Sequence, residues 1–284
     1  MSEATPNRFD APFRPRARGA TSAPLLPHAR AQVVAAASGK GGVGKTNLVA
    51  NLAIAAASLE ARVLLVDGDL GLANIDVLLG LTPERTIADV LSGACTLEQA
   101  LLDGPRGIRV LAAAAGRADL AALDERSLRR LARLVRLAAR RYDLVLVDAG
   151  AGVGPTVTGL AAACDRVLVV TNAEPTSLAD AYATLKLLRR ALPELPTEVL
   201  VNAARSEAEA HRTHQSLERV AQRFLGARVP LRAFLPHDER LARAVASQRA
   251  VVEMYPTAAI SRRIVALAQS LLRQKLEPPE AARP

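Results

Sequence analysis

Short, largely apolar runs alternate with longer segments of helical spacing along the chain. The apolar runs lie at residues 33–37, 62–66, 108–111, 144–147, 166–170 and 198–201. Helical spacing of apolar residues covers 47–59, 126–141, 178–192, 208–225 and 259–276. Strands without polar alternation are buried on both faces, as in a parallel sheet. The order therefore predicts an α/β fold, a doubly wound, mostly parallel sheet with helices on both faces.

Residues 1–31 lack this periodicity and are rich in proline, arginine and alanine. Such a composition predicts a flexible basic N-terminal tail. No break in composition divides the residues that follow, so 32–284 are expected to form one domain. This domain is predicted to end in an amphipathic helix at about 259–276.

Composition limits the functional classes. Of 284 residues, 50% are hydrophobic and only 2% aromatic, and there is no tryptophan, so stacking platforms for nucleic-acid bases are not expected. Two cysteines cannot build a disulfide framework or a four-thiolate metal site.

Neither a secretion signal nor an apolar run of about 18 residues is present, so a cytoplasmic protein is expected. The net charge of +9 favours acidic partner surfaces, but its sign does not choose among lipid, nucleic acid and protein.

The strongest motif lies between the first predicted strand and the first helix. Residues 39–46 fit the pattern G-x-x-x-x-G-K-[ST], in which glycines let backbone N–H groups face phosphate oxygens and the helix adds its positive end. Lys45 would neutralise β- and γ-phosphates, and the Thr46 hydroxyl would bind Mg²⁺. A glycine-rich turn that binds nothing is the structural alternative. The predicted nucleotide-binding residues of the loop are Gly39, Lys40, Gly41, Gly42, Val43, Gly44, Lys45 and Thr46.

Carboxylates follow two of the predicted strands. Asp67 and Asp69 come after the second strand, and Asp148 closes the strand at 144–147 before a glycine-containing segment. Ligands bind at the carboxyl ends of strands in open α/β sheets, and an aspartate in this position commonly holds Mg²⁺. Capping of the turns that follow is the alternative for all three residues.

Lys40, directly after the first glycine, is not needed for ordinary phosphate binding. With this lysine the loop resembles that of the MinD/ParA group of deviant Walker A ATPases. The resemblance implies slow ATP hydrolysis that acts as a switch, and an ATP-dependent homodimer in which Lys40 reaches the nucleotide of the other subunit. It also implies that Asp69 directs the attacking water, and that Asp67 and Asp148 serve the magnesium site with Thr46.

The same resemblance suggests how the base is bound. In relatives an asparagine at the end of a later strand contacts adenine, and a Pro-x-Asp segment packs beside it. These positions correspond to Asn202 and to Pro236 and Asp238. Asparagine offers both a donor and an acceptor, which suits adenine without excluding guanine. A turn role for Asn202 remains open.

Longer stretches at 69–80, 86–93 and 171–182 resemble the FlhG (FleN) family, MinD-like regulators of flagellar number and placement. The resemblance, which runs from about residue 32 to 275, implies ATP and Mg²⁺ as cofactors. The partners it implies are the signal-recognition-type GTPase FlhF, flagellar basal-body proteins or a flagellar transcription activator. Many relatives carry an N-terminal Asp-Gln-Ala-x-x-Leu-Arg segment that stimulates FlhF, and residues 1–31 do not match it. Stimulation of FlhF is therefore not carried over.

Two of the predicted helices each have two possible roles. The helix at 259–276 has one apolar side, which suits either reversible binding to the anionic inner face of the cell membrane or packing on the sheet. The helix at 126–141 carries a ridge of arginines, which suits either solvent or contact with DNA phosphates or an acidic partner. A ParA-type DNA-positioning ATPase is accordingly the alternative function. The arginines of this ridge are Arg126, Arg129, Arg130, Arg133, Arg136, Arg140 and Arg141.

Overall fold

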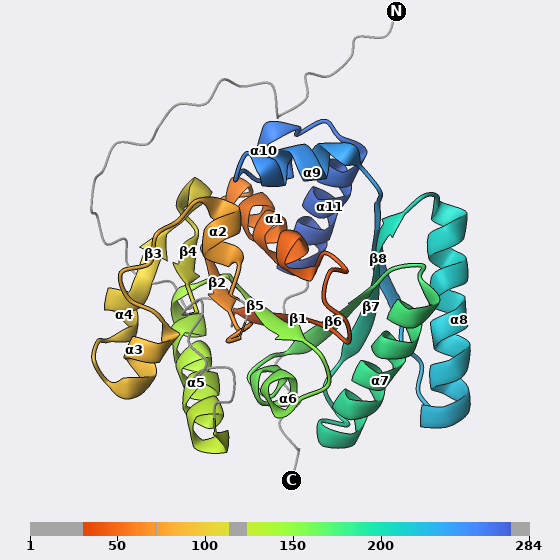
Figure 1. Cartoon of the computed structure of the whole chain (residues 1–284), viewed down its shortest axis with the longest axis horizontal. Helices are drawn as coiled ribbons and strands as arrows, with labels where there is room; N and C mark the ends of the chain where they lie inside the picture. Colours follow the sequence, from red (N-terminus) through yellow and green to blue (C-terminus); the bar gives the residue numbers. More distant parts are fainter. Residues whose placement is uncertain (1–30, 72, 114–123, 274–284) are drawn as a thin grey trace, which may run out of the picture.

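The computed structural model describes residues 31–71, 73–113 and 124–273, and within them one eight-stranded sheet carries helices on both faces (Figure 1). The strands are β1 Gln32–Ser38, β2 Val63–Asp67, β3 Leu101–Asp103, β4 Arg109–Leu111, β5 Leu144–Ala151, β6 Arg166–Thr171, β7 Thr197–Ala204 and β8 Leu231–Pro236.

The strand order across the sheet is β3-β4-β2-β5-β1-β6-β7-β8. Every neighbouring pair is parallel except β3 and β4, so the prediction of a doubly wound, mostly parallel sheet is confirmed. The central strand β1 lies between β5 and β6, where the winding of the chain changes direction. The loop after β1 therefore lies at the switch point where α/β sheets bind ligands.

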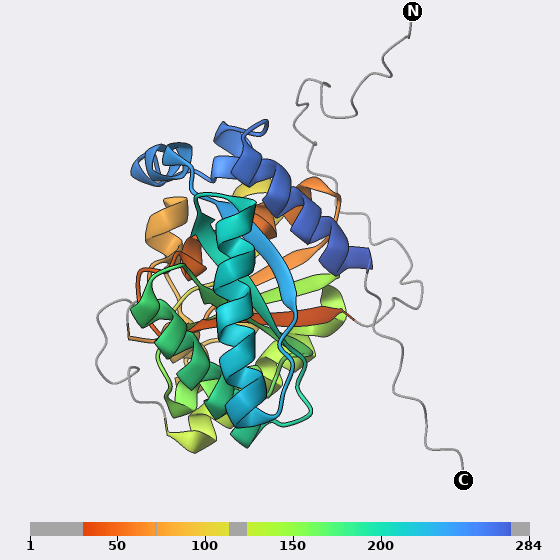
Figure 2. The same cartoon turned by 90° about the vertical axis from the view of Figure 1, so that its right-hand side faces the viewer.

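Helices cover the two faces in separate layers (Figures 1 and 2). Helices α1, α2, α9, α10 and α11 contribute buried residues to the core on one face, and α3 to α8 contribute to the core on the other. Two short 3₁₀ turns, Pro105–Gly107 and Ala139–Arg141, complete the described elements. The helices are α1 Lys45–Ser58, α2 Ile75–Leu79, α3 Ile87–Ser92, α4 Leu97–Ala100, α5 Glu125–Ala138, α6 Pro155–Ala161, α7 Pro175–Ala191, α8 Glu207–Leu225, α9 Glu239–Ala246, α10 Val251–Met254 and α11 Ala259–Arg273.

The continuous apolar character of the strands follows from this layering. In β1, Val33, Ala35 and Ala37 belong to the core beneath α5 to α8, whereas Val34 and Ala36 belong to the core beneath α1 and α11. Successive side chains of a strand point to opposite faces, so a strand covered on both sides must be apolar throughout. The predicted burial of the central strands on both faces is confirmed.

The structure also contains strands that the apolar pattern did not predict. β3 has only three residues and joins the sheet edge as the antiparallel neighbour of β4. β8 includes Arg232 and ends at Pro236, and it forms the other edge. Edge strands are covered less completely than central ones, so their sequences need not be continuously apolar.

The last described helix packs against the sheet layer. The apolar side of α11, formed by Ile260, Ile264, Leu267 and Leu271, is at most 4% exposed and belongs to the core shared with α1. This agrees with the packing interpretation of the helix, because a lipid-binding role for the same side would require it to leave the core. Within the described residues, no helix has the length and apolar character needed to cross a membrane.

The domain extends one residue beyond the predicted boundary. Ala31, assigned from the sequence to the tail, is buried in the core at 5% exposure. Residues 1–30 of the predicted tail and residues 274–276 of the predicted last helix lie outside the described residues.

The two cysteines are expected to differ in reactivity. Burial raises the pKa of the Cys164 thiol to about 12, so at about pH 8 only about one molecule in 10⁴ holds the reactive thiolate. Cys95 is partly exposed. A colorimetric thiol reagent should therefore modify Cys95 in the native protein and Cys164 only after unfolding in urea. Rapid modification of native Cys95→Ser protein would contradict this assignment.

Candidate nucleotide site

The motif at residues 39–46 forms the loop between β1 and α1 and the first residues of α1, as the sequence predicted. α1 begins at Lys45, and Gly44 precedes it with φ +86° and without a side-chain hydrogen bond to the first turn. A Cβ atom on Gly44 would lie 2.3 Å from Asn202 Nδ2, so a side chain there would collide as well as strain the backbone. The first turn of α1, where Thr46 and Asn47 are half-buried, offers N–H groups to an anion.

A cleft of about 440 Å³ opens over this loop. Asp69 and Asn74 line it from the segment after β2, Ala151 lines it from the end of β5, and Val245 lines it from α9. Its volume falls within the range of small-molecule sites. The cleft thus joins the phosphate loop and Asp69, which are far apart in the sequence. Asn202, Pro236 and Asp238 are not among its lining residues.

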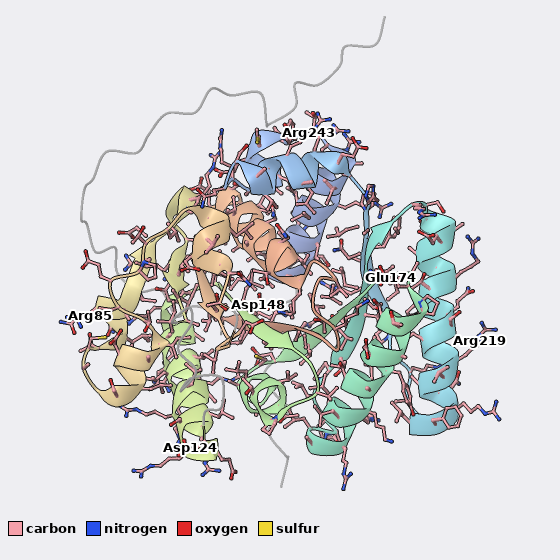
Figure 3. All side chains as sticks on the ribbon, in the orientation of Figure 1. Arg85, Asp124, Asp148, Glu174, Arg219 and Arg243 are labelled. Atoms are coloured by element: carbon pink, nitrogen blue, oxygen red, sulfur yellow. The ribbon has the colours of Figure 1, made fainter. Side chains whose placement is uncertain are left out.

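Lys45 and Asp148 form a buried ion pair beneath the loop. Lys45 is 6% exposed and Asp148 is fully buried, in the centre of the molecule (Figure 3). The Lys45 ammonium donates to Asp148 Oδ1, whereas Asp148 Oδ2 has no hydrogen-bond partner among the described residues. A buried carboxylate oxygen without a partner is costly, so this atom is a ready ligand for a cation.

Asp67 lies beside Asp148, because the two residues are paired in the ladder between β2 and β5. Its carboxylate accepts hydrogen bonds from the backbone N–H groups of Asp69, Asn74 and Ile75 at 3.1–3.2 Å. Burial raises the pKa of Asp67 to about 7, and the charge of Asp148 adds to the rise. Asp67 therefore shapes the segment that carries Asp69 and also concentrates negative charge beside Asp148.

These observations fit a divalent cation. Two adjacent carboxylates and one unpartnered buried oxygen provide the hard oxygen donors that Mg²⁺ prefers. Thr46 lies in the first turn of α1 and lines the cleft above them. Residues Thr46, Asp67 and Asp148, predicted as the magnesium site, are thus compatible with that ion. Among the described residues, no group of three or more His, Cys, Asp or Glu side chains forms a separate metal site.

Lys40 contacts a carboxylate that the sequence analysis did not single out. Its Nζ lies 2.9 Å from Glu174 Oε2 and 3.3 Å from Thr176 Oγ1, at the start of α7 (Figure 3). The ion pair is exposed, and the Lys40 ammonium holds the pKa of Glu174 below its usual value. The two lysines of the loop are therefore each neutralised within the same chain, Lys45 by Asp148 and Lys40 by Glu174. Glu174 and Thr176 lie in the stretch 171–182 that resembles the FlhG family, but no sequence feature predicted their contact with Lys40.

Asn202 holds the loop from below. Its side-chain amide donates to the Val43 carbonyl at 2.8 Å, and the residue is 6% exposed. Asp238 caps α9 and pairs with Arg240, and Pro236 ends β8 opposite Ala204. Asn202 thus lies near the end of β7, and the Pro236–Asp238 segment lies at the end of the neighbouring strand β8. Their contacts with adenine remain predictions.

The segment after Asp148 contains glycines in the left-handed region of backbone conformation. Gly150 has a φ of +74°, which is outside the range that proline can adopt. Gly152 donates its N–H to the Ser38 carbonyl at 2.8 Å. The segment therefore lies against the start of the phosphate loop on a path that a proline at position 150 would not follow.

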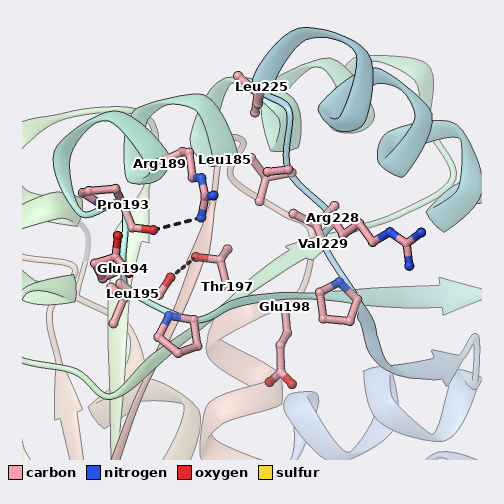
Figure 4. Close-up of a pocket in the computed structure, with 13 residues that line it drawn as sticks. Leu185, Arg189, Pro193, Glu194, Leu195, Thr197, Glu198, Leu225, Arg228 and Val229 are labelled. Carbon is pink, nitrogen blue, oxygen red and sulfur yellow. Dashed lines mark hydrogen bonds between the residues drawn. The ribbon is translucent and has the colours of Figure 1, made fainter.

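Another hollow lies at the opposite end of the sheet (Figure 4). It has a volume of about 340 Å³ and is lined by Thr197 and Glu198 at the start of β7 and by Arg189 and Leu185 of α7. Arg189 donates to the Pro193 carbonyl, and Thr197 donates to the Leu195 carbonyl. This hollow lies at the amino ends of the strands, whereas the phosphate loop lies at their carboxyl ends. None of the residues of the phosphate loop lines it.

Comparison with known proteins agrees with this geometry. The family profile described as "CobQ/CobB/MinD/ParA nucleotide binding domain" matches residues 34–251. The antiactivator FleN of Pseudomonas aeruginosa is 43% identical over 240 residues, which cover 84% of this chain and 86% of that protein. The flagellum site-determining protein YlxH of Helicobacter pylori is 30% identical over 262 residues, 86% of this chain and 82% of the relative.

A solved structure with bound ligand shows the same fold. The septum site-determining protein MinD from Pyrococcus horikoshii, complexed with Mg-ADP, superposes with a TM-score of 0.71 at 26% sequence identity. The match covers 85% of this chain and 96% of that one. The phosphate loop, the buried Lys45–Asp148 pair and the cleft therefore occur in a fold that carries a magnesium nucleotide in a relative.

Proposed function

The chain belongs to the CobQ/CobB/MinD/ParA nucleotide-binding family, and from this membership we propose that it is an ATPase switch that regulates the number or placement of flagella. The observation that carries the proposal is the phosphate loop above the buried Lys45–Asp148 pair. The flagellar role is supported by the 43% identity to FleN and by the similarity to YlxH. ATP and Mg²⁺ are the proposed ligands, in keeping with the Mg-ADP complex of the MinD relative.

We assign the following roles. The N–H groups of the loop and the first turn of α1 bind phosphate oxygens, and Lys45 neutralises the β- and γ-phosphates. Thr46 and Asp148 hold Mg²⁺, with Asp67 beside them, and the ion when bound offsets charge on the phosphates. Asp69 faces the same cleft and orients the attacking water. Positioning supplies the acceleration, so hydrolysis by the isolated protein is expected to be slow.

Lys40 is proposed to control assembly. In the structure its ammonium is bound to Glu174 and Thr176 of the same chain. An exposed pair of this kind contributes little to stability, so a nearby triphosphate can attract the lysine away from it. Lys40 would then contact the nucleotide of a second subunit, and ATP would hold the two copies together until hydrolysis.

Light scattering with ADP and with ATP tests this role. We expect ATP to double the mass of the wild-type protein, and Lys40→Ala to remain monomeric with ATP because the bridging charge is missing. Lys186→Ala, which removes an exposed lysine from the middle of α7, should dimerise normally. Equal masses in ADP and ATP for the wild type would overturn the switch mechanism.

The flagellar assignment needs a cellular test. Deleting the gene should change the number or position of flagella counted by electron microscopy, and the wild-type gene should restore them. The gene for Lys45→Ala protein should not, because the proposed role depends on nucleotide binding. An unchanged flagellar pattern in the deletion strain would contradict this role while leaving the ATPase assignment intact.

Association with the cytoplasmic face of the membrane and with FlhF, basal-body proteins or a transcription activator also belongs to the proposal. The name of the antiactivator FleN favours an activator among these partners. A single domain that begins at Ala31, with a basic tail before it, is also part of the proposal.

A further inference from the structure

A groove runs along the contact between α5 and α6, which lie side by side on the face of the sheet away from α1 (Figure 1). Two adjoining hollows of about 540 and 410 Å³ form it, and both are lined by Ala132, Arg133 and Ala162. This groove is separate from the nucleotide cleft, with which it shares no lining residue.

The floor of the groove is apolar. Leu128, Ala132, Leu137 and Ala162 line it, and the larger hollow also includes Pro155 at the start of α6. Leu137 is 57% exposed, which makes it one of the few large apolar side chains that the described residues leave open to solvent. A contiguous apolar surface beside charged residues is typical of a docking site.

The rim is mainly cationic, because three arginines, Arg129, Arg133 and Arg136, line the two hollows together with one carboxylate, that of Glu125. Arg133 forms no hydrogen bond or ion pair with any described residue, and Arg129 is held only by Glu125 in an exposed pair one turn away. The arginines that point elsewhere from α5 and the turn after it hold other parts of the chain. Arg130 donates to the Leu91 carbonyl, and Arg141 pairs with Glu98. Arg136, which lines the smaller hollow, pairs with Asp165.

An apolar floor beside a cationic rim favours a partner that has both an apolar side and negative charges. Nucleic acid would bind the arginines through its phosphates and would leave the apolar floor uncovered. An amphipathic helix with carboxylates on its polar side would use both parts, since its apolar side buries the floor while its charges meet the rim. We propose that the groove between α5 and α6 is a docking surface for an acidic amphipathic helix of another protein. The proposal does not depend on the nucleotide chemistry described above.

Fluorescence anisotropy with synthetic probes tests the proposal on the full chain. The first probe is a labelled helix of about 18 residues with leucine along one side and glutamate elsewhere. The second carries lysine in place of glutamate, and the third is a short DNA duplex. We expect the glutamate helix to bind saturably, and the lysine helix to bind at least about tenfold more weakly because the rim repels it.

Three variants separate the floor from the rim. Arg129→Glu/Arg133→Glu reverses the rim, and Ala162→Leu fills the groove without changing charge. The matched control, Arg219→Glu/Arg223→Glu, reverses two exposed arginines with the same spacing on α8. Both groove variants should weaken binding of the glutamate helix at least about tenfold, and the control should bind like the wild type. Unchanged circular dichroism and thermal unfolding confirm that each variant is folded.

Several results would overturn the proposal. The first is failure of the glutamate helix to bind, and the second is equal affinity for the lysine helix. Binding that Arg129→Glu/Arg133→Glu removes but Ala162→Leu leaves intact would show that only the charge is used. In that case, tight and salt-sensitive binding of the DNA duplex would identify the surface as a nucleic-acid contact instead.

Discussion

Replacing Lys45 with methionine should reduce ATP hydrolysis by at least on the order of 10³-fold and also destabilise the protein in the absence of nucleotide. The second effect follows from the structure, because Lys45 neutralises the fully buried Asp148. Without the ammonium, Asp148 would face Asp67 across the β2–β5 ladder with no compensating charge. Breaking one side of a buried ion pair typically costs about 3–5 kcal/mol of unfolding free energy.

A double variant distinguishes the two effects. Lys45→Met/Asp148→Asn removes both charges while keeping similar side-chain volumes, so it should recover most of the lost stability and none of the activity. Urea unfolding in the presence of a chelator measures stability, and release of inorganic phosphate measures hydrolysis. Lys186→Met, on the exposed side of α7, is the control and should match the wild type in both. A double variant no more stable than Lys45→Met would show that the pair does not stabilise the free protein.

Asp69→Ala should separate hydrolysis from binding. Asp69 lines the same cleft as the phosphate loop but does not belong to the buried Lys45–Asp148 pair. Loss of a residue that orients the attacking water should lower the hydrolysis rate on the order of 10²–10⁴-fold, while the affinity for ATP is retained. Because ATP is then not consumed, the ATP dimer should persist in light scattering.

A conservative variant at Asp69 and a control variant at a distant aspartate test whether the effect depends on the Asp69 carboxylate. Asp69→Asn keeps the shape of the side chain and should lose activity to a similar degree, since its amide is a poor acceptor for a water proton. Asp103→Ala removes a carboxylate that is 85% exposed at the sheet edge and should leave hydrolysis unchanged. If Asp69→Ala weakens ATP binding as strongly as it slows hydrolysis, Asp69 acts in forming the cleft and the assigned role is wrong.

The elements that the sequence predicted well are those in which local pattern and burial agree. Residues 144–147 of β5 are continuously apolar because helices cover both faces of the strand, and α5 shows helical spacing because only one side is buried. The strand at Leu101–Asp103 has three residues and gains its structure from pairing with β4. A segment that short carries too little periodicity to be recognised, so its position depends on its neighbour in space.

Among the site residues, the sequence alone determined the phosphate loop, because its glycines, Lys45 and Thr46 are contiguous and their chemistry is local. It also placed Asp67 and Asp69 at the end of the second strand, whereas Asp148, predicted to close its strand, lies within β5 and is paired there with Asp67. The tertiary structure decided how the charges are distributed, with Asp148 neutralising Lys45 and Glu174 neutralising Lys40. These partners lie more than a hundred residues apart, and only the packing of the sheet and α7 around the loop brings them within hydrogen-bonding distance.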